Sequence, residues 1–158
     1  MIELHLLRHA DAGDPMTWPG DDADRPLSGK GRRQAARLGS LLHAIGFLPD
    51  AVVASPKLRA LQTAEVVGAA LSVAITVDPR LGGALDYVTM DRILADAGEP
   101  RRPLLVGHDP DVSWLVSVLT GAPIEMRKCA LARIDLDAFN DGGGTLRWLL
   151  PPGLLPEL

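Results

Sequence analysis

The sequence predicts one α/β domain over residues 1–158, with a mostly parallel central sheet, helices on both of its faces and a hairpin at the C-terminal edge. Three observations lead to this fold. Short apolar runs alternate with helical patterns, several runs stop abruptly at polar residues, and the last two runs flank the glycine-rich turn 141–144. A chain of 158 residues buries enough surface to form such a core unaided.

The elements follow one another in regular alternation. We expect strands at residues 2–7, 51–54, 74–77, 103–106, 129–136 and 145–150, and helices at 28–45, 56–71, 87–97 and 110–119. The last two strands form the edge hairpin. Residues 10–26 are rich in Asp, Gly and Pro and predict a long loop, a kind of segment that is often functional.

Capping residues support the helix boundaries. Ser28 is a suitable N-cap for the first helix, and Gly46 lies where that helix should stop. Ser55 is expected to cap the second helix, with Pro56 at its first position. Asp86 is expected to cap the third helix.

Composition excludes several classes of protein. The chain is 47% hydrophobic and 23% charged, as in ordinary globular proteins, and its net charge of −4 argues against a nucleic-acid-binding surface. The single cysteine, Cys129, excludes an intramolecular disulfide and fits a reducing compartment. The N-terminus resembles a strand and not a signal peptide, and no apolar run is long enough to span a membrane. We therefore expect a cytoplasmic monomer with no membrane or nucleic-acid partner.

Basic residues follow three of the predicted strands. Arg8-His9 follows the first strand, the segment from Ser55 to Arg59 follows the second, and Gly107-His108 follows the fourth. Ligand sites in open α/β sheets lie outside the carboxyl ends of the strands. We therefore expect a pocket that holds Arg8, His9, Arg59 and His108.

Such a pocket suits a phosphoryl group. Each guanidinium can hold two phosphate oxygens, and Arg59 lies in the first turn of a helix, where the backbone also favours an anion. Neighbouring arginines should lower the pKa of His9, leaving the neutral imidazole that nucleophilic attack requires. The second ring nitrogen should be held by a hydrogen bond, for which a backbone carbonyl is the expected acceptor.

Four sequence blocks, in order, resemble the histidine phosphatase superfamily, which has the phosphoglycerate-mutase-like fold. They are Leu7-Arg8-His9-Ala10-Asp11, Arg25-Pro26-Leu27-Ser28-Gly29-Lys30-Gly31, Ser55-Pro56-Lys57-Leu58-Arg59-Ala60-Leu61-Gln62-Thr63-Ala64 and Leu105-Val106-Gly107-His108. The resemblance implies that His9 is transiently phosphorylated. It also implies that Arg8, Arg59 and His108 bind the phosphoryl group and stabilise its transition state, and that Arg25 contributes from the loop.

Within that superfamily the chain is most similar to the SixA-type phosphohistidine phosphatases, through its small size and its Arg-His-x-Asp-Ala motif. Larger members carry a glutamate after the third strand that protonates an alcohol leaving group. Residues 79–85 contain no carboxylate here, and Asp86 is the nearest substitute. An imidazole leaves without strong acid assistance, so the missing acid favours phosphohistidine as substrate. Ala10 stands where the superfamily often has Gly, and we expect no loss of activity from it.

Alternatives remain at this point. The substrate could be a phosphorylated protein or a small phosphate ester, and a non-catalytic phosphate-binding module is a third possibility. We expect no cofactor, and no metal site at His5, His9 and His108, because the adjoining arginines would repel a cation. Trp18 could contact substrate from the loop or simply hold that loop in place.

Overall fold

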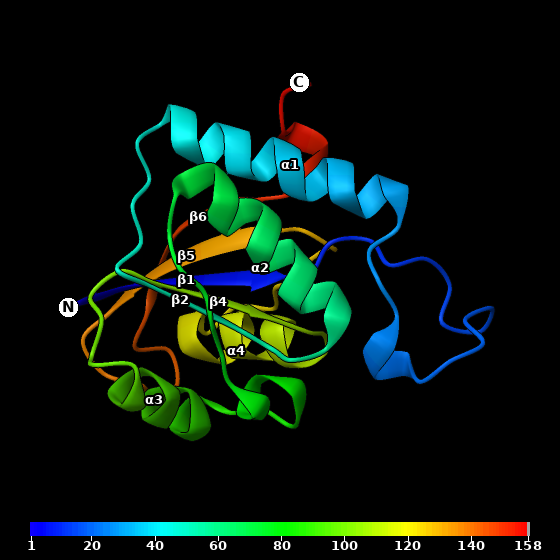
Figure 1. Cartoon of the computed structure of the whole chain (residues 1–158). Coiled ribbons are helices and arrows are strands. Elements are labelled where there is room, and N and C mark those ends of the chain that lie inside the picture. Colours follow the sequence, from blue (N-terminus) through cyan, green and yellow to red (C-terminus); the bar gives the residue numbers. More distant parts are fainter. Residues whose placement is uncertain (158) are drawn as a thin grey trace.

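A computed structural model describes residues 1–157 and contains one six-stranded sheet of order β3-β2-β4-β1-β5-β6 (Figure 1). The strands are β1 Ile2–Arg8, β2 Ala51–Ala54, β3 Thr76–Val77, β4 Pro103–Gly107, β5 Leu131–Leu136 and β6 Thr145–Leu150. The first four strands pair in parallel, whereas β5 runs antiparallel to both β1 and β6. The mostly parallel sheet with a C-terminal edge hairpin is therefore confirmed.

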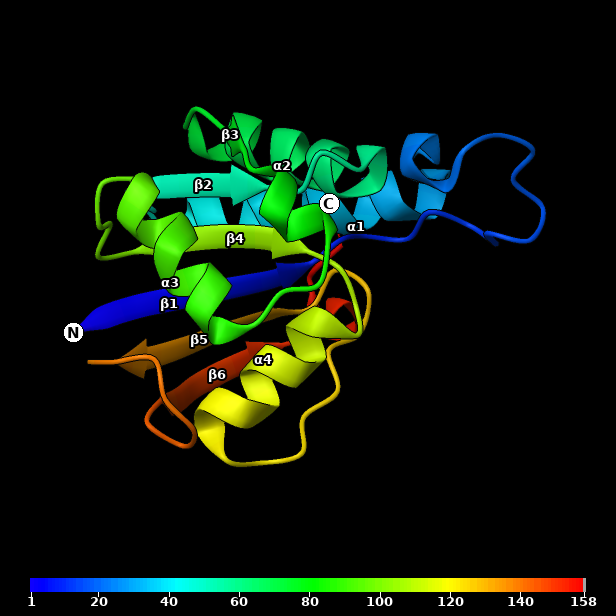
Figure 2. The same cartoon turned by 90° about the horizontal axis from the view of Figure 1, so that it is seen from below.

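Helices cover both faces of this sheet. Helices α1 Gly29–Ala44 and α2 Leu58–Leu71 pack on one face, and α3 Tyr87–Asp96 and α4 Asp111–Thr120 lie on the other (Figures 1 and 2). Short 3-10 turns occur at Asp22–Asp24, Pro79–Gly82 and Pro152–Leu154. Among residues 1–157, no helix combines the length and the apolar character needed to cross a bilayer.

Alternating side chains of the central strands separate two hydrophobic cores. Leu6 of β1 and Leu105 of β4 pack with α3 and α4, whereas Leu7 and Val106 point to the opposite face and pack with α1 and α2. These side chains are all at most 1% exposed. Strands buried on both faces explain why the sequence shows continuous apolar runs instead of polar alternation.

Two of the three predicted N-caps are present. The Ser28 hydroxyl accepts from the backbone N–H of Gly31, and the Asp86 carboxylate accepts from that of Thr89. The prediction for α2 was wrong, because the helix begins at Leu58 with Lys57 as its N-cap residue. The hydroxyl of Ser55 serves another purpose: it bonds the ring of His108.

Two strands are shorter than the sequence predicted. Strand β3 spans only Thr76–Val77, because the chain leaves α2 through a left-handed turn at Ser72 and the N–H of Val73 still bonds the carbonyl of Gly68. Strand β5 begins at Leu131, because Cys129 adopts a positive φ of 62° that interrupts an extended chain.

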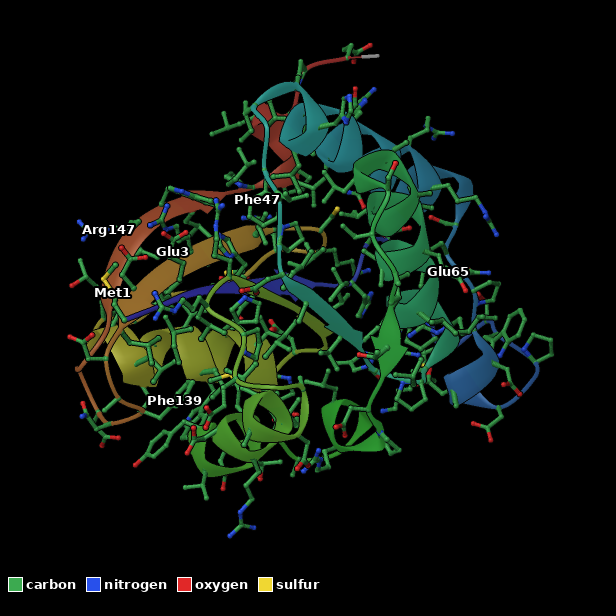
Figure 3. The ribbon with its side chains drawn as sticks, turned by 60° about the vertical axis from the view of Figure 1, so that its left-hand side comes forward. Met1, Glu3, Phe47, Glu65, Phe139 and Arg147 are labelled. Atoms are coloured by element: carbon green, nitrogen blue, oxygen red, sulfur yellow. The ribbon has the colours of Figure 1, made fainter. Side chains whose placement is uncertain are left out.

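Charged side chains gather at the end of the sheet where β1 begins. Glu3 pairs with Arg102 and Arg133, and the buried carboxylate of Asp135 pairs with Arg133 and Arg147. Glu3, Arg147 and Met1 lie on this side of the molecule in Figure 3. Since β1 ends at Arg8, immediately before His9, these ion pairs are remote from the predicted pocket and are structural.

The loop after β1 is fastened to the start of α1. The backbone N–H of Asp11 donates to Gln34 Oε1, and its carbonyl accepts from the N–H of Ser28. Gly31 makes this contact possible, because a Cβ at that position would lie 1.9 Å from the Asp11 carbonyl oxygen. The glycine of the second sequence block therefore allows α1 to approach the segment that carries His9.

We predict that Gly31→Ala lowers the free energy of unfolding by about 1–3 kcal/mol, because the added methyl group meets backbone that cannot move freely. Urea unfolding followed by circular dichroism measures the loss. Gly29→Ala is the matched control, since its Cβ would approach only the flexible end of Arg33. Equal stability of the two variants would contradict the packing role of Gly31.

Candidate active site

The carboxyl ends of β1, β2 and β4 bring the predicted site residues together. His9, Arg59 and His108 are at most 9% exposed, and the Arg8 side chain is 21% exposed. The rings of His9 and His108 lie 5.2 Å apart between centroids, at an angle of 51°. Because β4 lies between β1 and β2, segments about fifty residues apart in the chain become neighbours.

The backbone and ring of His9 are both fixed. Its N–H donates to the carbonyl of Gly107 at 3.0 Å, and its carbonyl accepts from the N–H of Cys129 at 3.0 Å. Ring Nδ1 lies 2.7 Å from the Ala10 carbonyl, which can only accept. Nδ1 therefore carries the proton, and Nε2 keeps the lone pair that a nucleophile needs. The acceptor is a backbone carbonyl, as the sequence analysis expected.

Burial keeps both histidines neutral. Desolvation is the largest cause that lowers the pKa of His9 to about 4, and Arg59 and Arg8 lower it further. The pKa of His108 falls to about 3 for the same main reason, with His9 as the next contributor. The sequence analysis attributed the lowered pKa of His9 to the arginines, whereas the structure makes their effect secondary to burial.

Arg8 is held at the site by the segments after β4 and before β5. Its guanidinium donates to the carbonyl of Met126 at 2.8 Å and lies 3.2 Å from the carboxylate of Asp109. Asp109 in turn accepts from the backbone N–H and the hydroxyl of Ser113. Sequence reasoning missed Asp109, although its position next to His108 could have indicated a role at the site.

Arg59 is bound by the loop after β1. Its two terminal nitrogens donate to Asp22, one to the carbonyl at 2.8 Å and one to the carboxylate at 3.0 Å. Arg25 donates to the same carboxylate at 3.1 Å and to the carbonyl of Ala12 at 2.8 Å. The structure thus places Arg25 within the loop, separated from Arg59 by Asp22, where its hydrogen bonds shape the loop.

His108 is oriented by β2. Its Nε2 lies 2.7 Å from the hydroxyl oxygen of Ser55, which also accepts from the backbone N–H of Lys57. Sequence reasoning assigned Ser55 to a helix cap and missed this contact. The signal was its position directly after the second strand, at the same sheet edge as the two histidines.

Three buried nitrogen atoms at this edge have no hydrogen-bond partner among residues 1–157. They are Arg8 Nε, Arg59 Nε and His108 Nδ1. Arg8 Nε and Arg59 Nε are donors, and His108 Nδ1 is a donor when the Ser55 hydroxyl donates to Nε2. An unpaired buried donor costs about 1–3 kcal/mol, so these atoms indicate a binding site for a group rich in acceptors. The same range of residues contains no cluster of His, Cys, Asp or Glu suited to a metal ion. The arrangement can hold an oxyanion beside a neutral imidazole.

Helix α2 holds the chain next to His9 through residues of the third sequence block. Thr63 Oγ1 accepts from the backbone N–H of Ala10 at 3.0 Å and donates to the carbonyl of Arg59 at 2.7 Å. Gln62 Oε1 accepts from the N–H of Leu27 at 2.9 Å. Since the Ala10 carbonyl accepts from His9 Nδ1, Thr63 holds in place the residue that fixes the ring of the nucleophile.

Two carboxylates near the loop between β3 and α3 differ in the direction of their pKa shifts. Asp86 is exposed and caps α3, and its hydrogen bonds to Thr89 lower its pKa, which makes it a poor proton donor. Asp111, in the first turn of α4, is half-buried, and burial raises its pKa. Sequence reasoning considered Asp86 and missed Asp111, whose position in the helix that follows His108 was the available signal.

Trp18 holds the loop in which it lies. Its Nε1 donates to the carbonyl of Asp21 at 2.9 Å, immediately before the residue that binds Arg59. Of the two roles considered for Trp18, the structure supports the one within the loop.

The fold and the comparison with known families together indicate one class of enzyme, the phosphatases of a single superfamily. Residues 4–84 match the model of the histidine phosphatase superfamily, branch 1. The chain belongs to this family, as its four sequence blocks suggested.

Particular relatives are similar over almost the whole chain. An uncharacterised protein of Picosynechococcus is 31% identical, over 95% of this chain and all of its own length. The protein named probable phosphoglycerate mutase GpmB of Salmonella paratyphi B is 24% identical, over 85% of each chain. The structure of the protein histidine phosphatase SixA complexed with tungstate superimposes with a TM-score of 0.82 and 28% identity, over 96% of this chain and 98% of that one.

We predict that His9 stays neutral well below the usual histidine range. An ordinary imidazole gains its proton near pH 6.5, whereas His9 should do so near pH 4, because burial disfavours the charged ring. As the pH falls, the unfolded chain binds this proton near pH 6.5, before the folded chain does. The contribution of His9 to the free energy of unfolding is therefore fully present above pH 6.5 and is lost as the pH falls from 6.5 to about 4. NMR titration of the ring resonances measures the midpoint, and a value near 6.5 would contradict the assignment.

We predict that Thr63→Val lowers the free energy of unfolding by about 1–3 kcal/mol and slows catalysis, because the buried N–H of Ala10 loses its acceptor. Thermal unfolding and steady-state rates measure the two effects. Thr63→Ser keeps the hydroxyl and should retain most of the activity. Equal rates for the valine and serine variants would show that the hydroxyl does not position His9.

Proposed function

We propose that this protein is a phosphatase in which His9 is the nucleophile and phosphohistidine on a signalling or phosphotransfer protein is the substrate. His9 Nε2 attacks phosphorus, the bond to the leaving group breaks, and the enzyme carries phosphate on His9. Water then attacks the phosphorus, releases inorganic phosphate and restores the free imidazole. Cytoplasmic location, expected from the lone buried Cys129, is part of this proposal.

The single observation that carries the proposal is the neutral His9 ring beside three unpaired donors. Nδ1 is committed to Ala10, and Arg8 Nε, Arg59 Nε and His108 Nδ1 are free to bind equatorial oxygens of the phosphoryl group. Fixed donors of this kind stabilise the charge that develops in phosphoryl transfer. The similar SixA structure, solved with tungstate, supports an oxyanion site in this fold.

The leaving group can be inferred from the acids that could protonate it. Asp86, the carboxylate nearest in sequence to the loop 79–85, is ionised at neutral pH because its hydrogen bonds lower its pKa. An alkoxide needs a proton as it departs, whereas a phosphorylated imidazole gains a proton on its other ring nitrogen at about pH 6.5 and then departs as neutral imidazole. Asp86 is thus unsuited to protonate an alcohol, which supports cleavage of a phosphorus–nitrogen bond.

A small phosphate ester is the second candidate substrate. Its specific support is Asp111, because a carboxyl with a raised pKa is the kind of group that protonates an alcohol. The relative named probable phosphoglycerate mutase is also consistent with small phosphorylated substrates. A non-catalytic role fits less well, since all four proposed catalytic side chains are present and the rings of His9 and His108 lie 5.2 Å apart.

We predict that the enzyme forms a phosphoenzyme on His9. Brief reaction with ³²P-labelled substrate, followed by denaturation, should give label that is stable in alkali and lost in acid. His9→Ala should abolish the label and reduce turnover by at least about a thousandfold. His43→Ala is the control, because that histidine is exposed on α1. Retained turnover in His9→Ala would refute the mechanism.

We predict a preference for phosphohistidine of at least about tenfold in kcat/KM over sugar phosphates. Assays of a phosphohistidine protein against a panel of phosphate esters measure it. Asp111→Asn separates the two candidates, because it should slow ester cleavage strongly and phosphohistidine cleavage little. Preference for the esters would replace the first proposal by the second.

A further inference from the structure

A groove of about 580 Å³ adjoins the site without containing His9. Arg8 is one of its lining residues. Helix α1 forms one wall through Lys30, Arg33 and Arg37, and the segment before β5 forms another through Arg127 and Lys128. The groove is thus continuous with the phosphoryl site through a side chain that the two share.

The charge of the groove is opposite to that of the whole protein. Six lining residues are cationic and two, Asp11 and Glu125, are acidic, although the chain carries a net charge of −4. Lys128 is paired with Asp11, and Arg37 with Glu157. Lys30, Arg33 and Arg127 are exposed and form no ion pair with any carboxylate among residues 1–157. Unpaired cations gathered on an acidic protein indicate an anionic partner.

The spacing of the cations gives the length of the charged surface that such a partner would contact. Lys30, Arg33 and Arg37 occupy positions i, i+3 and i+7 and therefore share one face of α1. This stripe runs about 10 Å along the helix. The groove that this stripe lines does not include His9, so a small ester bound at His9 does not fill it.

We propose that the groove binds an acidic surface of the protein that carries the phosphohistidine. The inference rests on the proposed function and adds the chemistry of the partner: carboxylate side chains presented beside the phosphorylated histidine. The rest of the enzyme repels such a surface, so the groove both attracts the substrate and orients its phosphoryl group toward Arg8 and His9.

Short synthetic peptides with one phosphohistidine test this partner chemistry. One peptide carries glutamates on both sides of the phosphohistidine, and the other carries glutamines. The native enzyme should show about tenfold higher kcat/KM for the acidic peptide, through a lower KM at similar kcat. The difference should shrink between about 0.05 and 0.3 M salt, because screening weakens exposed charge pairs.

The variant Lys30→Gln/Arg33→Gln/Arg127→Gln removes the unpaired cations without touching the proposed catalytic side chains. It should abolish the preference for glutamates and leave the rate with phosphoramidate, a small substrate, unchanged. Arg32→Gln is the matched control, because Arg32 is exposed on the same helix and does not line the groove. It should keep the full preference.

The possible outcomes are distinct. Equal kcat/KM for the two peptides on the native enzyme, or an equal loss with phosphoramidate in the triple variant, overturns the groove proposal and leaves the phosphohistidine activity standing. If neither peptide is dephosphorylated while phosphate esters are, the proposed function fails and this inference fails with it. A tenfold preference lost only in the triple variant supports the acidic partner.

Discussion

Burying two arginines and two histidines at one sheet edge is the constraint on which the surrounding structure depends. Four charged groups packed together would repel one another strongly in a medium of low dielectric constant. The structure limits this cost in two ways. Asp109 and Asp22 each pair with one arginine, and burial keeps His9 and His108 neutral, with pKa values of about 4 and 3. The neutral imidazole needed for attack is thus a consequence of the fold.

Fixing the geometry of His9 requires contacts from many parts of the chain. Strand β4 and the segment before β5 hold its backbone, Ala10 holds Nδ1, and Thr63 of α2 holds the peptide of Ala10. Gly31 lets α1 pack directly on the next residue, Asp11. These contacts lie within the protein, and together they restrict the direction in which His9 Nε2 points. Such preorganisation is worth several kcal/mol in phosphoryl transfer.

Asp22 links the site to the loop after β1. It occupies both terminal nitrogens of Arg59 and also binds Arg25, while its own side chain is 54% exposed. These contacts leave Arg59 Nε unpaired, and a phosphoryl group can bind the arginine there. The groove of unpaired cations is lined by Arg8 and not by Asp22, so an anionic partner bound there does not compete with Asp22 for Arg59.

The sequence alone determined the family, the mostly parallel sheet and the gathering of Arg8, His9, Arg59 and His108, because apolar periodicity and short motifs are local properties of the chain. It failed at side chains that act across the fold: Ser55 orients His108 instead of capping α2, and Asp22, which binds Arg59 and Arg25, was missed. The contribution of Arg25 to phosphate binding stays a prediction. Only the tertiary structure decided that burial, more than neighbouring charge, lowers the pKa of His9. The tertiary structure alone also showed that Lys30, Arg33 and Arg127 line one groove. Both the burial of a side chain and its neighbours in space depend on residues that are distant in the chain.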